Sequence, residues 1–120
     1  MKLIRDKIPM LMKQAGVKFE ARVADNDEYK ELLVKKMQEE VKELMEDQDI
    51  EEAADVYEVF LALIKLWGHD VHDVVAHAEA KQAERGGFSQ RVVLLDSETY
   101  KTNTGVSKYT SQLFGTPGED

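Results

Sequence analysis

Residues 37–58, MQEEVKELMEDQDIEEAADVYE, carry a run of carboxylates on two consecutive stretches with helical periodicity. The carboxylates of interest are Glu39, Glu40, Glu43, Glu52 and Asp55. At 100° per residue on the first stretch, Glu40 falls at the edge of an apolar arc beside Leu33. Glu43 lies about 60° further round on the same flank, as an i, i+3 pair does. This stretch therefore predicts a helix with acidic groups bordering its apolar face.

The second stretch places its carboxylates on the apolar side more clearly. Glu52 falls between Val59 and Leu63, and Asp55 lies close to Leu66 on the helical projection. An isolated carboxylate in an apolar environment is costly unless it is paired or coordinates a metal. We therefore expect these two side chains to have a partner.

Three explanations account for such a pattern. One is a solvated acidic face, which is common on helices. A second is pairing with basic side chains, for which Lys36, Lys81 and Arg85 are candidates. The third is a divalent cation, because carboxylate oxygens suit Mg²⁺ or Mn²⁺ and helical bundles build metal sites from acidic i, i+3 pairs on facing helices.

Composition narrows the class of protein. The chain has 120 residues, an apolar fraction of 42%, no cysteine and a formal net charge of −8. This length suits one domain, and the acidic balance argues against nucleic-acid binding. Apolar runs are too short to cross a membrane, and the charged start MKLIRDKIP is unlike a signal peptide. We expect a cytoplasmic protein with neither a membrane nor a nucleic acid as its partner.

Capping and breaking residues predict a mainly α fold, an antiparallel helical bundle. Pro9 and Gly16 bracket a short N-terminal helix. Long helices are expected from the cap residues at 25–27 to about 47, from Asp49 to Gly68, and from about Asp70 to the glycines at 86–87. Alternating residues at 18–24 and the apolar run at 91–95 predict a small two-stranded β element. The expected domain spans residues 1–95, followed by a flexible or partner-bound tail at 96–120.

Four motifs, taken in order, resemble those of a known family. Residues 39–43, EEVKE, match an E-E-x-x-E motif, and residues 52–55, EAAD, match the E-x-x-D that follows it one helix later. Together they resemble the MazG-like, all-α nucleoside triphosphate pyrophosphohydrolases, a superfamily that includes phosphoribosyl-ATP pyrophosphohydrolase. The stretches KLIRDKIP at 2–9 and KQAERGGF at 81–88 resemble a small house-cleaning branch of that family.

The resemblance implies an Mg²⁺-dependent enzyme, with Mn²⁺ as a substitute, that hydrolyses nucleoside triphosphates, modified ones included, to a monophosphate and pyrophosphate. The metal ligands that it implies are Glu40, Glu43, Glu52 and Asp55. Glu39 would orient or deprotonate the attacking water. Lys81 and Arg85, one helical turn apart, would bind phosphate, and Arg5 and Lys7 are further candidates for that role.

Two alternatives remain open at this stage. Phosphoribosyl-ATP is a rival substrate within the same fold, although the N-terminal motif disfavours it. A rival from another class is a non-catalytic acidic helical module that binds metal or a basic partner. The helix from Asp49 to Gly68 is apolar around most of its circumference, which predicts a homodimer or a dimer of dimers.

Overall fold

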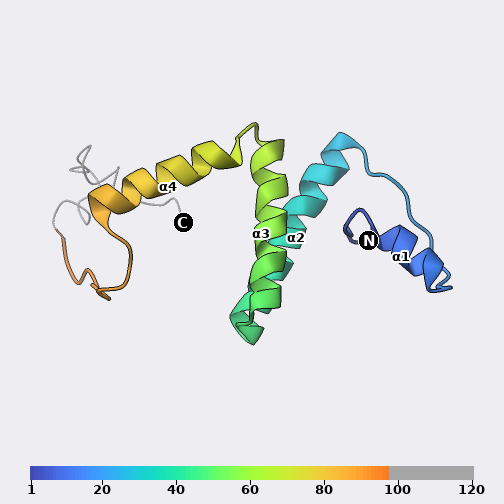
Figure 1. Cartoon of the computed structure of the whole chain (residues 1–120), viewed down its shortest axis with the longest axis horizontal. Coiled ribbons are helices and arrows are strands. Elements are labelled where there is room, and N and C mark those ends of the chain that lie inside the picture. Colours follow the sequence, from blue (N-terminus) through green and yellow to red (C-terminus); the bar gives the residue numbers. More distant parts are fainter. Residues whose placement is uncertain (98–120) are drawn as a thin grey trace. The chain divides into compact units, whose positions relative to one another are not determined.

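The computed structural model describes residues 1–97 of the chain, and these contain four helices (Figure 1). The helices are α1 (Ile8–Gln14), α2 (Asn26–Asp47), α3 (Ile50–Leu66) and α4 (Val71–Arg85). The chain divides into two compact units, of which the first is Met1–Val74 and the second begins at Val75. The prediction of a mainly helical protein is confirmed.

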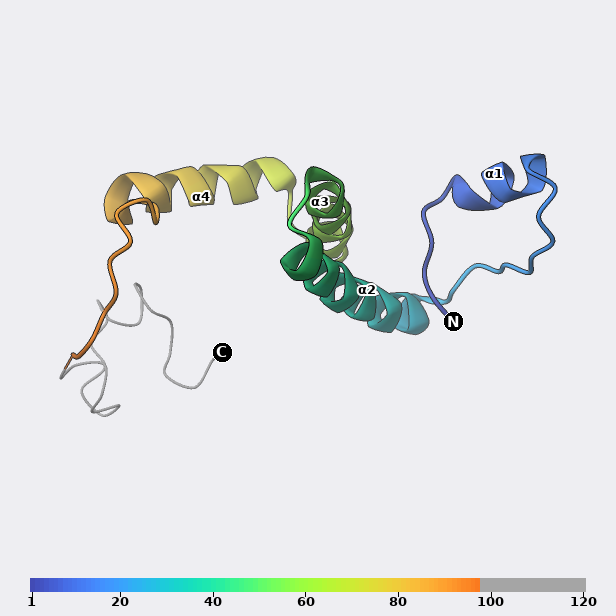
Figure 2. The same ribbon diagram turned by 90° about the horizontal axis from the view of Figure 1, so that it is seen from below.

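Helices α2 and α3 form an antiparallel hairpin, and Figures 1 and 2 show the two helices close together near their connection and diverging toward their other ends. Asp25 caps α2 by accepting a hydrogen bond from the Glu28 backbone N–H at 2.9 Å, and Asp49 caps α3 in the same way through Glu52 at 2.9 Å. Gln48 ends α2 in the left-handed conformation, with φ 55°. These caps satisfy backbone groups that the helices leave free, and they fix a connection of only two residues.

The other helix ends also follow the predicted signals. Pro9 lies in the first turn of α1, and Gly16 follows that helix with φ 75°. Asp70 accepts a hydrogen bond from the His72 backbone N–H at 2.7 Å at the start of α4. Gly86, with φ 83°, directly follows the last residue of α4. Glycine adopts this left-handed backbone conformation without the steric cost that a side chain adds.

The core of the first unit lies between α2 and α3. Its buried members are Leu33 from α2 and Val59 and Leu63 from α3. Partly buried apolar residues packed against them are Leu3, Tyr29, Met37, Ala62 and Leu66. Because Leu3 precedes α1, this contact anchors the N-terminal segment on the helical hairpin. The anchor matters for the site described below.

The prediction of a small two-stranded β element is wrong, because residues 1–97 contain no strand. Residues 17–25 instead form an extended connection between α1 and α2 (Figure 2). The alternation at 18–24 predicted one buried face, yet Val23 is 94% exposed. In the second segment Val92 is 85% exposed, and Arg91 has φ 58°. A lone pair of strands is marginal without an apolar face to pack on, and neither segment has one.

Several expectations about assembly stay predictions. Helix α4 begins in the first unit and continues into the second, so its packing against the hairpin is untested. The same holds for the predicted dimer or dimer of dimers and for the domain boundary at residue 95. The predicted tail lies almost wholly outside the described residues. Among the described residues, none of the helices combines the length and the apolar character that a membrane span requires.

Candidate metal centre

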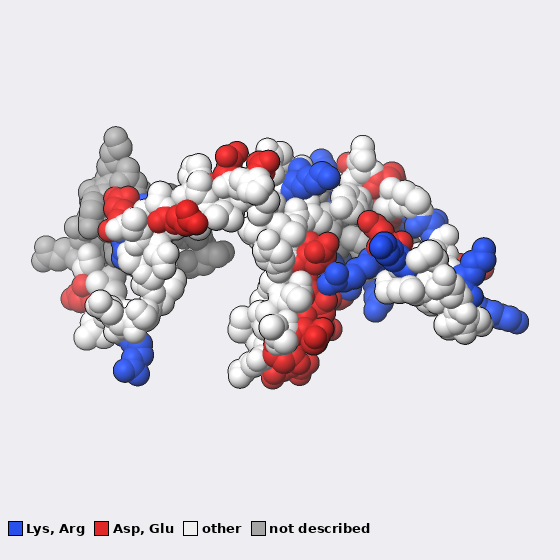
Figure 3. Space-filling view, viewed as in Figure 1, with Lys and Arg blue, Asp and Glu red and all other residues white. Residues whose placement is uncertain are grey.

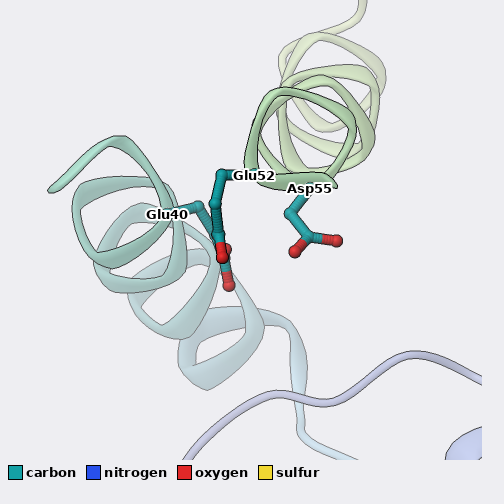
Figure 4. Close-up of side chains that lie close together, drawn as sticks. All are labelled: Glu40, Glu52 and Asp55. Atoms are coloured by element: carbon teal, nitrogen blue, oxygen red, sulfur yellow. The ribbon is translucent and has the colours of Figure 1, made fainter. Parts of the chain in front are cut away.

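The α2–α3 hairpin brings together three of the predicted carboxylates. Its short connection places the second half of α2 alongside the first half of α3, so Glu40 faces Glu52 and Asp55. Figure 4 shows the three carboxyl groups turned toward the same region beside the two helices. One oxygen from each residue lies within 4.8 Å of the corresponding oxygen of the other two. We call these residues the acidic triad.

Two oxygen atoms of the acidic triad are buried without a hydrogen-bond partner. Glu40 is only 6% exposed, and its Oε1 forms an ion pair with the Lys36 ammonium at 3.2 Å. Its other oxygen, Oε2, has no partner, and neither does Oε2 of Glu52. A buried acceptor without a partner costs free energy, and more so when it is charged. No donor from the described part of the chain therefore reaches these two oxygens.

The neighbouring cations balance only part of the negative charge. Lys36 pairs with Glu40, and the Arg5 guanidinium donates to Asp55 Oδ1 at 2.7 Å. No basic side chain among residues 1–97 forms an ion pair with Glu52. Of the predicted basic partners, Lys36 pairs with a triad member, Glu40, whereas the partner of Asp55 is Arg5, which was not among them. Figure 3 shows acidic side chains gathered over the α2–α3 pair with basic side chains at their border.

Glu52 shows the electrostatic consequence of this arrangement. Burial raises the pKa of Glu52 to about 7, and the negative charge of Glu43 adds to the rise. The charges of Asp49 and Asp55 contribute less to the raised pKa. Near neutral pH Glu52 is therefore protonated in part of the molecules.

The donor set fits a divalent cation. Carboxylate oxygens are the ligands that Mg²⁺ prefers, at about 2.1 Å, which separates octahedral ligands by about 3 to 4.2 Å. The triad oxygens lie within 4.8 Å of one another, so small side-chain movements bring them into that range. A divalent cation would also neutralise the two unpartnered oxygens.

Two predicted site residues on α2 lie outside the triad. Glu43 is exposed and approaches Glu52, whose pKa it raises, but it is not one of the three converging ligands. Glu39 is exposed and lines a small hollow with Leu3, Lys35 and other residues near the N-terminus. Glu43 as a ligand and Glu39 as the water-activating group stay predictions.

The predicted phosphate-binding residues fall into two groups. Arg5 touches the triad through Asp55, and Lys7 lines a pocket beside it. Lys81 and Arg85 are exposed on the part of α4 that belongs to the second unit, so the structure does not relate them to the triad. Their role stays a prediction.

A pocket of about 1080 Å³ adjoins the triad, between the N-terminal segment, residues 19–21 and the α2–α3 hairpin. Glu40 and Asp55 form part of its wall. Glu58, which was not predicted as a site residue, lines this pocket too, as do Tyr29 and Phe19. The i, i+3 spacing of Asp55 and Glu58 was the sequence pattern that could have indicated that Glu58 lies near the site.

The comparisons with known proteins find no match to this chain among family models, curated proteins or solved structures. The fold and the site by themselves define a class: a mainly α-helical protein, over its described residues, with an acidic triad that can bind a metal ion. The likeness to the MazG-like family rests on the sequence motifs.

Proposed function

We propose that the protein is an Mg²⁺-dependent nucleoside triphosphate pyrophosphohydrolase, which cleaves between the α and β phosphates. The observation that carries the proposal is the acidic triad with its two buried, unpartnered oxygens. These side chains belong to the two motifs that resemble the MazG-like family. The pocket beside the triad supports the proposal, because its volume suits a ligand of nucleotide size.

In this proposal the triad holds the metal, and each residue has a distinct environment. Glu40 is held in place by burial and by Lys36, so it is the most rigid ligand. Glu52 gives up its proton to bind the ion, and Asp55 shares its charge with Arg5. Bound Mg²⁺ would neutralise phosphate charge and lower the pKa of a coordinated water.

The remaining residues take supporting roles. Glu43, next to Glu52, would complete the ligand set or accept a hydrogen bond from a metal-bound water. Glu39 would orient the attacking water, as the resemblance implies. Lys81 and Arg85 would bind the pyrophosphate that leaves, where extra positive charge stabilises the charge that develops.

The first prediction is that the protein releases pyrophosphate from nucleoside triphosphates when Mg²⁺ is present. The test is a panel of common and damaged triphosphates, with pyrophosphate and orthophosphate measured separately. Pyrophosphate and a nucleoside monophosphate are the expected products, and chelation of the metal should stop their release. Orthophosphate as the main product, or no turnover on any member, would contradict the proposal.

The same triad also suits a protein that binds metal without chemistry. The two proposals differ in their response to nucleotide, because any ligand that binds the folded state raises the melting temperature. An enzyme should be stabilised further when a triphosphate is added to the metal-loaded form, whereas a simple metal-binding module should not.

Including phosphoribosyl-ATP in the substrate panel distinguishes this rival substrate from nucleoside triphosphates. Phosphoribosyl-ATP should turn over more slowly than the preferred nucleoside triphosphate.

A further inference from the structure

The pocket beside the triad has walls of opposite charge. The hairpin contributes Glu40, Asp55 and Glu58 to its lining, and with them one cation, Lys36. The N-terminal segment contributes Lys2, Arg5 and Lys7, and with them one carboxylate, Asp6; a further carboxylate, Glu20, lies in the connection after α1. A site with mostly carboxylates on one side and mostly cations on another suits a metal–anion complex, because the metal meets the carboxylates and the anion meets the cations.

Arg5 stands where the two walls meet. Its Nη2 donates to Asp55 Oδ1 at 2.7 Å, across fifty positions of the chain. Both side chains are well exposed, 54% for Arg5 and 41% for Asp55, and an ion pair in such a setting contributes little free energy. A guanidinium has five N–H donors, so this single contact leaves donors for another acceptor. The contact is therefore easy to exchange.

Asp55 is also a member of the triad, so Arg5 and a metal ion would share one carboxylate. Two positive charges placed on the same carboxylate repel each other, and the doubly charged ion binds the more strongly. Leu3 anchors the N-terminal segment on the core, so Arg5 stays near the pocket when it leaves Asp55. It then needs a new anionic partner close by.

We propose that this pocket binds a polyphosphate anion, and that Arg5 exchanges Asp55 for a phosphate oxygen of that anion when the metal binds. Arg5 thereby links metal binding to anion binding. The metal weakens the Arg5–Asp55 contact, and the freed guanidinium raises the affinity for the anion. This inference rests on the proposed metal centre and names the chemical class of ligand that the adjoining pocket takes.

The test compares Arg5→Gln with a matched control, Arg22→Gln. Arg22 lies in the same unit, is 57% exposed and pairs with Glu28 at 2.6 Å, but it does not line the pocket. Both variants therefore lose one positive charge from an arginine of similar exposure, and the control loses the stronger ion pair, because Arg22 donates two hydrogen bonds to Glu28. Calorimetry measures the affinity for Mg²⁺ alone, and then for inorganic tripolyphosphate with Mg²⁺ in excess of this chelating anion.

Arg5→Gln should bind Mg²⁺ alone at least as tightly as the wild type, because a competing cation is gone. Its affinity for tripolyphosphate should fall by about tenfold or more, since a charge-assisted bond is lost. Arg5→Lys should recover part of that loss. Arg22→Gln should match the wild type in both measurements, and the melting temperatures of the metal-free variants should be close to that of the wild type.

The opposite results would overturn the inference. Unchanged tripolyphosphate affinity in Arg5→Gln, an equal loss in Arg22→Gln, or no binding to the wild type would each do so. Weaker Mg²⁺ binding in Arg5→Gln would also contradict the exchange, because it would mean that Arg5 only orients Asp55. The outcome is separable from the proposed function. Arg5-dependent binding of tripolyphosphate without turnover of any nucleotide would contradict the proposed enzyme and support this inference. Turnover of a nucleotide together with an unchanged tripolyphosphate affinity in Arg5→Gln would support the enzyme and contradict this inference.

Discussion

Replacing Glu40 with glutamine is expected to abolish metal-dependent turnover, with a loss of about a hundredfold or more. Glu40 is the most buried member of the triad, and one of its oxygens has no hydrogen-bond partner among residues 1–97. Glutamine keeps the shape of the side chain but removes the charge that a divalent ion requires. The rise in melting temperature that Mg²⁺ causes in the wild type should disappear together with the activity.

The control for this substitution is Glu46→Gln, an exposed glutamate on the same helix that lies outside the triad. It removes an equal charge and should leave activity and metal binding unchanged. Metal-free Glu40→Gln should still fold, because glutamine keeps the shape of the side chain, but it should be less stable than the wild type, because Lys36 loses its charged partner. Full activity in Glu40→Gln, or a similar loss in Glu46→Gln, would remove Glu40 from the site.

The second large effect is on the pH dependence of metal binding. The pKa of Glu52 is raised to about 7, so a proton competes with the metal at neutral pH. The apparent affinity for Mg²⁺ should fall by about tenfold for each pH unit below 7 and level off above it. Titration calorimetry from pH 5.5 to 8.5 measures this slope, and proton release on binding should show as a dependence on buffer ionisation enthalpy.

Glu52→Gln should bind the metal weakly and lose this slope, whereas Glu51→Gln, an exposed neighbour, should keep it.

The stability of the metal-free protein should change with pH in the opposite direction to the metal affinity. Its folded state has the higher pKa, about 7 against 4.5, and so binds more protons than the unfolded chain between these values. The free energy of unfolding should therefore fall as pH rises from about 4.5 through 7. A flat affinity profile in the wild type would contradict the role of Glu52.

Much of the fold was predictable because local chemistry determines it. Asp49 is the cap residue of α3 in both the prediction and the structure, and Asp25 is the one of the three predicted candidates at 25–27 that caps α2. Angular position alone also placed Glu40 at the edge of the apolar face of α2, and the structure buries it. Periodicity works in these cases because a helix fixes the direction of each side chain, and the short connection between the helices leaves one way to pair them.

What the sequence could not supply depends on contacts between distant segments. No pattern within residues 1–9 indicates that Arg5 meets Asp55, since that contact depends on how the N-terminal segment lies on the core. The alternation at 18–24 was misleading, because a strand needs a neighbour that local sequence does not reveal. Glu43 was predicted as an equal ligand, yet its offset from Glu40 leaves it exposed at the margin of the triad.

The most direct test of the central claim is a crystal structure of the protein grown with Mn²⁺, using the anomalous scattering of the ion to locate it. An anomalous peak about 2.1 Å from carboxylate oxygens of Glu40, Glu52 and Asp55 is the expected result, with the ion contacting the two oxygens that otherwise have no partner. Mn²⁺ bound elsewhere, or these three carboxylates still facing one another with only protons and water between them at saturating metal, would contradict the account.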